Sequence, residues 1–219
     1  MGISESIRKY KAELGEDVTL VAISKTKPAE DLKEAYNAGQ RIFGENKIQE
    51  MTEKWESLPK DIEWHMVGHV QTNKVKYMAP FVNLIHAVDS LKLLKEINKE
   101  AEKNDRTIDC LLQIKIAEED TKFGLDVEEA REILASEKFS EMKNVKVTGL
   151  MGMATYTDDE AVVRGEFDYL KSVYENFKKK NPQFKTLSMG MSGDYQLAID
   201  CGSNMVRIGS AIFGERNYN

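Results

Sequence analysis

The sequence has 219 residues, of which 41% are hydrophobic and 31% charged, and its formal net charge at pH 7 is −6. This length fits one globular domain with a sizeable core, and the composition excludes a disordered or fibrous chain. The 31 basic residues are scattered among 37 acidic ones, without the basic block typical of nucleic-acid binding. We therefore expect one globular domain that does not bind nucleic acid.

The cysteines and the N-terminal segment indicate the compartment. Cys110 and Cys201 lie far apart and have no metal-binding spacing, which is typical of reduced thiols in a reducing environment. Residues 1–8 contain no apolar signal core, and the sequence has no apolar run long enough to cross a membrane. We expect a cytoplasmic protein without a membrane partner.

Short apolar runs of strand length alternate with longer stretches of helical periodicity along the whole chain. After an opening helix over residues 3–13, strands are predicted over residues 18–25, 41–45, 62–68, 84–89, 108–116, 145–154, 186–190 and 205–209. Helices are predicted between them over residues 29–38, 48–57, 73–78, 91–103, 127–136, 158–180 and 195–201.

The alternation of strands and helices predicts an α/β fold. Helical crossovers between successive strands imply parallel pairing. A chain of about 200–250 residues with eight such units has the usual size of a closed barrel. We therefore predict a single-domain (β/α)8 barrel of the TIM type over residues 1–219, with an extra N-terminal helix; an open doubly wound sheet is the alternative.

Lys25 ends the first predicted strand, after a run that is apolar over most of its length. In a barrel of this type the reactive groups lie at the carboxyl ends of the strands. An amine partly desolvated there has a lowered pKa and can form an imine with an aldehyde. A lone lysine at a strand end is more often simply solvated, so this interpretation depends on its neighbours.

Small residues follow the last two predicted strands. Ser192 and Gly193 come after the seventh strand, and Gly209 and Ser210 end the eighth. Backbone N–H groups of such residues approach an anion closely, and this is the usual phosphate position in these barrels. Each stretch alone also fits an ordinary turn. A phosphate site beside an imine-forming lysine predicts pyridoxal 5′-phosphate (PLP) as cofactor.

Three further residues are candidate contacts of the cofactor. Arg207 shares a strand face with Gly209. It either binds the pyridine nitrogen and keeps it unprotonated, or it contacts the phosphate or forms an outer ion pair. Asn46, after the second strand, is a candidate contact of the phenolic oxygen. His65, inside an apolar strand, fits a core histidine as well as a ligand contact. His69 and His86 have no carboxylate or cysteine partner at metal-ligand spacing, so we predict no metal site.

The sequence resembles the pyridoxal phosphate homeostasis protein family, also called the YggS or PROSC family, nearly from end to end. The resemblance rests on AISKTKP at 22–28, FGEN at 43–46, WHMVGHVQTNK at 64–74, GMSGD at 190–194 and VRIGSAIFG at 206–214. It implies the barrel of the alanine racemase N-terminal domain and PLP bound as an internal aldimine, a Schiff base, on Lys25.

The resemblance also implies roles for other residues. Ser192, with Gly209 and Ser210, is expected to hold the phosphate, and Arg207 to lie beside the pyridine nitrogen. Met191 is expected among the cofactor-binding residues. Lys122, in the stretch DTKFG at 120–124, is expected near the cofactor entrance, where it assists transfer.

Two functions of different classes use Lys25: a PLP carrier and a racemase-like PLP enzyme acting on amino acids. A two-base racemase needs a second acid–base group, which alanine racemases bring as a tyrosine from another domain. The sequence ends at Asn219 without such a domain, and nothing in it places Tyr156 or Tyr218 in that role. We therefore expect a monomeric carrier in intracellular PLP homeostasis, with no assigned catalytic residue and with PLP-dependent apo-enzymes as partners. A lysine Schiff-base aldolase acting on a sugar phosphate is a third, weaker hypothesis.

Overall fold

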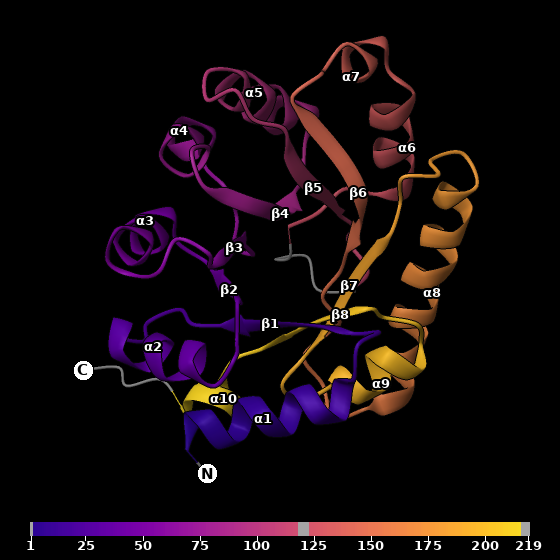
Figure 1. Cartoon of the computed structure of the whole chain (residues 1–219). Helices are drawn as coiled ribbons and strands as arrows, with labels where there is room; N and C mark the ends of the chain where they lie inside the picture. Colours follow the sequence, from indigo (N-terminus) through magenta and orange to yellow (C-terminus); the bar gives the residue numbers. More distant parts are fainter. Residues whose placement is uncertain (1, 118–122, 216–219) are drawn as a thin grey trace.

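Eight parallel strands close into a barrel in the order β1 to β8 (Figure 1). The computed structural model describes residues 2–117 and 123–215 of the chain. The strands are β1 (Thr19–Ile23), β2 (Ile42–Glu45), β3 (Glu63–Met66), β4 (Val82–Val88), β5 (Ile108–Gln113), β6 (Val145–Met151), β7 (Thr186–Met191) and β8 (Met205–Ile208). The predicted (β/α)8 barrel is confirmed, and the alternative of an open sheet is wrong.

The helices surround this barrel, and α1 lies beside α2 and α10 (Figure 1). They are α1 (Ile3–Leu14), α2 (Ala29–Asn37), α3 (Ile48–Ser57), the 3-10 helix η1 (Thr72–Lys74), α4 (Val75–Met78), α5 (Leu91–Glu102), α6 (Val127–Ala135), α7 (Glu137–Ser140), α8 (Glu160–Lys178), α9 (Tyr195–Asp200) and α10 (Ser210–Phe213). The sequence did not predict α7 and α10, because a helix of one turn is too short to show a period.

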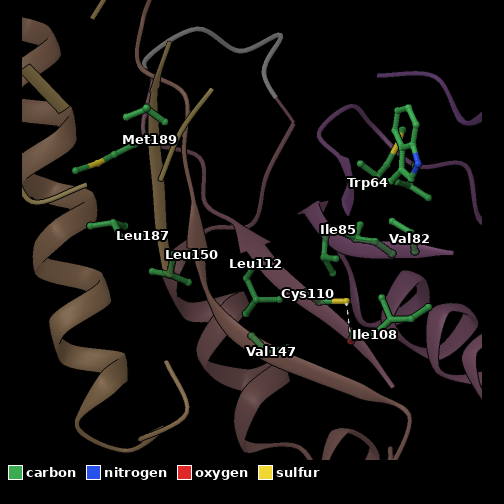
Figure 2. Packing of buried hydrophobic residues seen from close by; sticks show 14 of the residues in the cluster. Trp64, Val82, Ile85, Ile108, Cys110, Leu112, Val147, Leu150, Leu187 and Met189 are labelled. Carbon is green, nitrogen blue, oxygen red and sulfur yellow. Dashed lines mark hydrogen bonds between the residues drawn. The ribbon is translucent and has the colours of Figure 1, made fainter. Parts of the chain in front are cut away.

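The strands bury side chains on both faces, as expected for a parallel sheet covered by helices. The outward side chains belong to the large core between barrel and helices; Figure 2 shows part of it, with Leu112 of β5 beside Leu150 of β6. A smaller apolar cluster fills part of the interior and includes Val21, Leu111 and Met205. Successive residues of one strand therefore alternate between the two cores.

Both cysteines are buried and free, as predicted. Cys110 lies in β5 and Cys201 just after α9. Burial raises the pKa of both thiols, that of Cys201 to about 11, so neither is a reactive thiolate at neutral pH. Among the described residues, no helix is long and apolar enough to cross a membrane.

Candidate functional site

A cavity of about 550 Å³ opens at the carboxyl ends of the barrel strands. Its size lies within the range of about 300–1,000 Å³ that is usual for small-molecule sites. The strand ends meet here because all eight strands run in the same direction. Seven of the predicted site residues line it: Lys25, Asn46, Met191, Ser192, Arg207, Gly209 and Ser210.

The structure does not bring His65 to this cavity. Its side chain is buried inside the barrel, where its Nδ1 atom lies 3.0 Å from Nε2 of His86. The signal that made His65 a candidate, a polar residue in an apolar strand, reflects a contact with another strand. Lys122 and Tyr218 lie outside the described residues.

A chain of buried hydrogen bonds joins Arg207 to this histidine pair. The Nη1 atom of Arg207 donates to the Oγ of Ser188 at 2.7 Å and to its carbonyl oxygen at 2.9 Å, and Nη2 donates to the carbonyl oxygen of Gly152 at 2.9 Å. The same Oγ lies 3.1 Å from Nδ1 of His86. These bonds use three of the five N–H donors of a guanidinium, so two have no hydrogen bond to another described residue.

Burial shifts the pKa values along this chain. It lowers the pKa of His65 to about 3, and that of His86 well below its ordinary value, so both rings are neutral at pH 7. Burial also lowers the pKa of Arg207 to about 10, which leaves the guanidinium charged at pH 7. The cavity floor therefore presents a fixed positive charge backed by neutral imidazoles.

Lys25 lies two residues beyond the end of β1 rather than at the strand end as predicted, and the peptide groups on both sides of it are hydrogen-bonded. The carbonyl oxygen of Ser24 accepts from Nζ of Lys54 at 2.7 Å, and the N–H of Thr26 donates to Oε1 of Glu50 at 2.6 Å. The apolar side chains of β1 form the barrel wall up to Ile23, and these hydrogen bonds hold the backbone beyond the end of the strand.

The loops after β7 and β8 lie close together, and the loop after β8 is next to the end of β1. Ser192 Oγ accepts a hydrogen bond from the N–H of Gly209 at 3.2 Å. A Cβ atom on Gly209 would lie 3.2 Å from both Cβ and O of Ile23, so a larger residue there would push these loops away from β1. Helix α10 begins at Ser210, and the first N–H groups of a helix have no intrahelical acceptor. Hydroxyl and backbone donors therefore converge on this wall.

Asn46 has a buried side-chain oxygen, Oδ1, without a hydrogen-bond partner among the described residues. Buried polar atoms are nearly always paired in folded proteins. A side-chain amide can offer either its oxygen or its NH2 group to a ligand. A hydroxyl group bound in the cavity could donate to this oxygen, whereas a phenolate would need the NH2 group.

The mouth of the cavity carries Phe123 and Tyr156, to which the sequence assigned no position in the site. The ring of Phe123 stacks on His69 with centroids 4.4 Å apart, and its carbonyl oxygen accepts from Nε2 of Gln113 at 2.7 Å. Phe123 is 57% exposed and Tyr156 is 98% exposed. No spacing pattern could have found them, because they lie in loops that follow different strands. No cluster of metal-ligating side chains is present in the described ranges.

Comparisons with known proteins agree with this geometry. A protein-family model described as "Alanine racemase, N-terminal domain" matches residues 2–217. A protein of Aquifex aeolicus (strain VF5) named pyridoxal phosphate homeostasis protein is 41% identical over 221 residues, which cover 99% of this chain and 96% of the relative. The chain belongs to the pyridoxal phosphate homeostasis protein family. The predicted family is thus confirmed.

Two solved structures with a similar fold can be compared with this chain. PipY of Synechococcus elongatus PCC7942, solved with PLP bound, has a TM-score of 0.87 and 32% identity, covering 97% of this chain and 100% of PipY. An alanine racemase of Clostridium difficile 630 has a TM-score of 0.80 and 15% identity, covering 98% of this chain and 56% of the racemase. The racemase therefore shares the barrel, and the likeness shows the fold alone.

Proposed function

We propose that the chain binds PLP as an internal aldimine on Lys25 and acts as a carrier in cytoplasmic PLP homeostasis. The observation that carries the proposal is the placement of Lys25 in one cavity with the hydroxyl and backbone donors of the loops after β7 and β8. The names of the relatives support it, since one is a PLP homeostasis protein and another was solved with PLP bound.

The residues present fit the cofactor. Ser192 and Ser210 would hold the phosphate through hydroxyl and backbone N–H groups. Asn46 would meet the phenolic oxygen through its side-chain amide, and the spare donors of Arg207 would face the pyridine nitrogen. PLP supplies an aldehyde that condenses reversibly with the Lys25 amine.

The charge of Arg207 limits the chemistry that the bound ring could support. A permanently charged partner keeps the pyridine nitrogen unprotonated, which makes the ring a weaker electron sink than a carboxylate partner would. The buried bonds to Ser188 and Gly152 hold the guanidinium in place. Chemistry that needs a delocalised carbanion is therefore disfavoured at this site.

A racemase-like enzyme is the second candidate, because Tyr156 lines the same cavity and offers a phenol. A two-base mechanism needs its second group held over the face of the cofactor. Tyr156 is 98% exposed, so its ring lies largely in solvent. We therefore place carriage first, with a monomeric protein and PLP-dependent apo-enzymes as recipients.

The test is the absorbance of the protein with added PLP, before and after borohydride, for wild type, Lys25→Ala and Lys27→Ala. Lys27 is the matched control because it also lines the cavity, with its Nζ donating to the carbonyl oxygen of Glu215 at 2.8 Å. We expect a yellow band, removed by reduction, in wild type and Lys27→Ala but not in Lys25→Ala. A band that persists in Lys25→Ala and is absent from Lys27→Ala would contradict the assignment.

A second assay separates the two candidate functions. The loaded wild-type protein is incubated with L-alanine, and formation of the D-enantiomer is followed by chiral chromatography. A carrier releases PLP to an apo-enzyme without producing the D-enantiomer. Turnover that is lost in Tyr156→Phe would establish the racemase-like alternative instead.

A further inference from the structure

Lys54 of α3 contacts the segment after β1 that carries Lys25, and its side chain is almost fully buried. Its Nζ atom donates three hydrogen bonds of 2.7 Å each, to the carbonyl oxygen of Ser24 and to Oε1 of Glu45 and of Glu50. An ammonium group has three donors and no acceptor, so these bonds use its whole capacity. The two bonds to carboxylates are charge-assisted and therefore strong.

The network reaches the backbone on both sides of Lys25. Lys54 binds the carbonyl oxygen that precedes Lys25, and Oε1 of Glu50 accepts the N–H of Thr26, which follows it. On the strand side, the Oγ of Ser24 donates to Oε1 of Glu45 at 2.7 Å. The orientations of the two flanking peptide groups set the direction in which the Lys25 side chain leaves the backbone.

Thr26 shows that this backbone is held rather than relaxed. Its φ is +64°, in the left-handed region that a β-branched residue rarely adopts. Such a conformation persists where surrounding contacts impose it. The Glu50 carboxylate supplies one such contact, and without it Thr26 can return to a negative φ. That return would rotate the peptide group between Lys25 and Thr26.

We propose that Lys54, Glu45 and Glu50 form a positioning network that fixes the Lys25 backbone and so presents its amine to the cavity in one orientation. The inference rests on the proposed function, in which Lys25 is the imine-forming amine. In that reaction the amine nitrogen adds to the aldehyde carbon, and the aldehyde oxygen leaves as water with the two hydrogens of the nitrogen. The network touches neither reactant, and it acts through the backbone.

Glu50→Ala is the variant that tests the network. Its side chain is 22% exposed, so its loss leaves no large buried cavity. We measure the rate at which the apo protein forms the absorbance band with added PLP, and we locate the reduced adduct by peptide mass spectrometry. Misplacing a reacting group by about 1 Å costs about a hundredfold in rate, so we expect a loss of roughly tenfold to a hundredfold. Glu53→Ala, on the same helix but outside the network, is the matched control and keeps the wild-type rate.

A rescue experiment separates positioning from general damage. Glycine adopts a positive φ without strain, so Thr26→Gly in the Glu50→Ala background restores access to the native backbone and should recover most of the rate. Pyridoxal, which lacks the phosphate, replaces PLP in a parallel assay. The same fold-loss in Glu50→Ala is expected with both aldehydes, because the network acts on the amine.

The results of these assays distinguish failure of the proposed function from failure of the positioning network alone. A wild-type protein that forms no adduct on Lys25 would overturn the proposed function and this inference with it. A wild-type adduct together with an unchanged rate in Glu50→Ala would overturn the inference alone. A slow Glu50→Ala that Thr26→Gly leaves slow, or a loss seen with PLP but not with pyridoxal, would also overturn it.

Discussion

The buried histidine pair makes the stability of the fold depend on pH. Burial holds the pKa of His65 at about 3, against 6.5 for an ordinary histidine, and that of His86 also lies well below this value. Below pH 6.5 the unfolded chain binds protons that the folded chain does not. The stability contributed by such a group is therefore fully present above pH 6.5 and is lost as the pH falls.

The size of the effect follows from the linkage relation. Between pH 7 and pH 5.5, each histidine that titrates normally when unfolded and stays neutral when folded removes about 1.3 kcal/mol from the free energy of unfolding. In His65→Gln one of the two titrations is gone, so the loss on acidification should be about 1.3 kcal/mol smaller than in wild type. Glu45, whose pKa burial raises to about 7, acts in the opposite direction. The stabilisation that Glu45 contributes is present at low pH and declines as the pH rises from 4.5 to 7. This contribution cancels in the comparison because wild type and His65→Gln both contain Glu45.

The assay is urea unfolding at both pH values, followed by circular dichroism, with free energies from linear extrapolation. Ser188→Ala is the matched control: it removes hydrogen bonds from the same chain but no titrating group. It should lower stability at both pH values and leave the difference between them as in wild type. If His65→Gln loses as much stability on acidification as wild type does, His65 is not held neutral and the reasoning is refuted.

Three glycine substitutions give further predictions. Gly149→Ala would place a Cβ atom 1.8 Å from the carbonyl oxygen of Thr186, so we expect urea unfolding to show a loss of about 1–3 kcal/mol or more. Gly165→Ala, inside α8 with open space around it, should instead gain about 0.5–1 kcal/mol; a loss would contradict this. Gly68→Ala would bring a Cβ atom within 2.4 Å of the Asn46 carbonyl oxygen, so a PLP titration should show weakened binding, and unchanged affinity would argue against a role for Asn46.

The barrel could be predicted because each strand is buried on both faces and reads as a short apolar run. Strand ends were less certain: the strand predicted over residues 84–89 spans Val82–Val88, because Asn83, an exposed residue near its start, interrupts the apolar run. Lys25, Ser192 and Ser210 could be placed in one cavity because parallel strands bring their carboxyl ends together.

The interior contacts could not be predicted, since their partners are far apart in sequence. His65 and His86 are 21 positions apart, and His86 and Ser188 are 102 apart, with nothing local to join them. Alternation along β3 does not say how far below the strand end an inward residue lies, so it cannot separate a cavity residue from one buried deeper. The buried position of Lys54 could not be predicted either, because a lysine on a helix is usually solvated.

Two buried polar systems thus hold Arg207 and Lys25, two of the basic residues that line the cavity. Arg207 is fixed through Ser188 and Gly152, and Lys25 through the peptide groups that Lys54 and Glu50 bind. Burying a polar group costs free energy unless it is hydrogen-bonded, and fixed donors then need no reorganisation when a ligand arrives. Among the described residues, the mouth of the cavity carries two exposed aromatic side chains, Phe123 and Tyr156. Polar groups that are already held in place suit reversible capture of an aldehyde, because binding does not have to order them first.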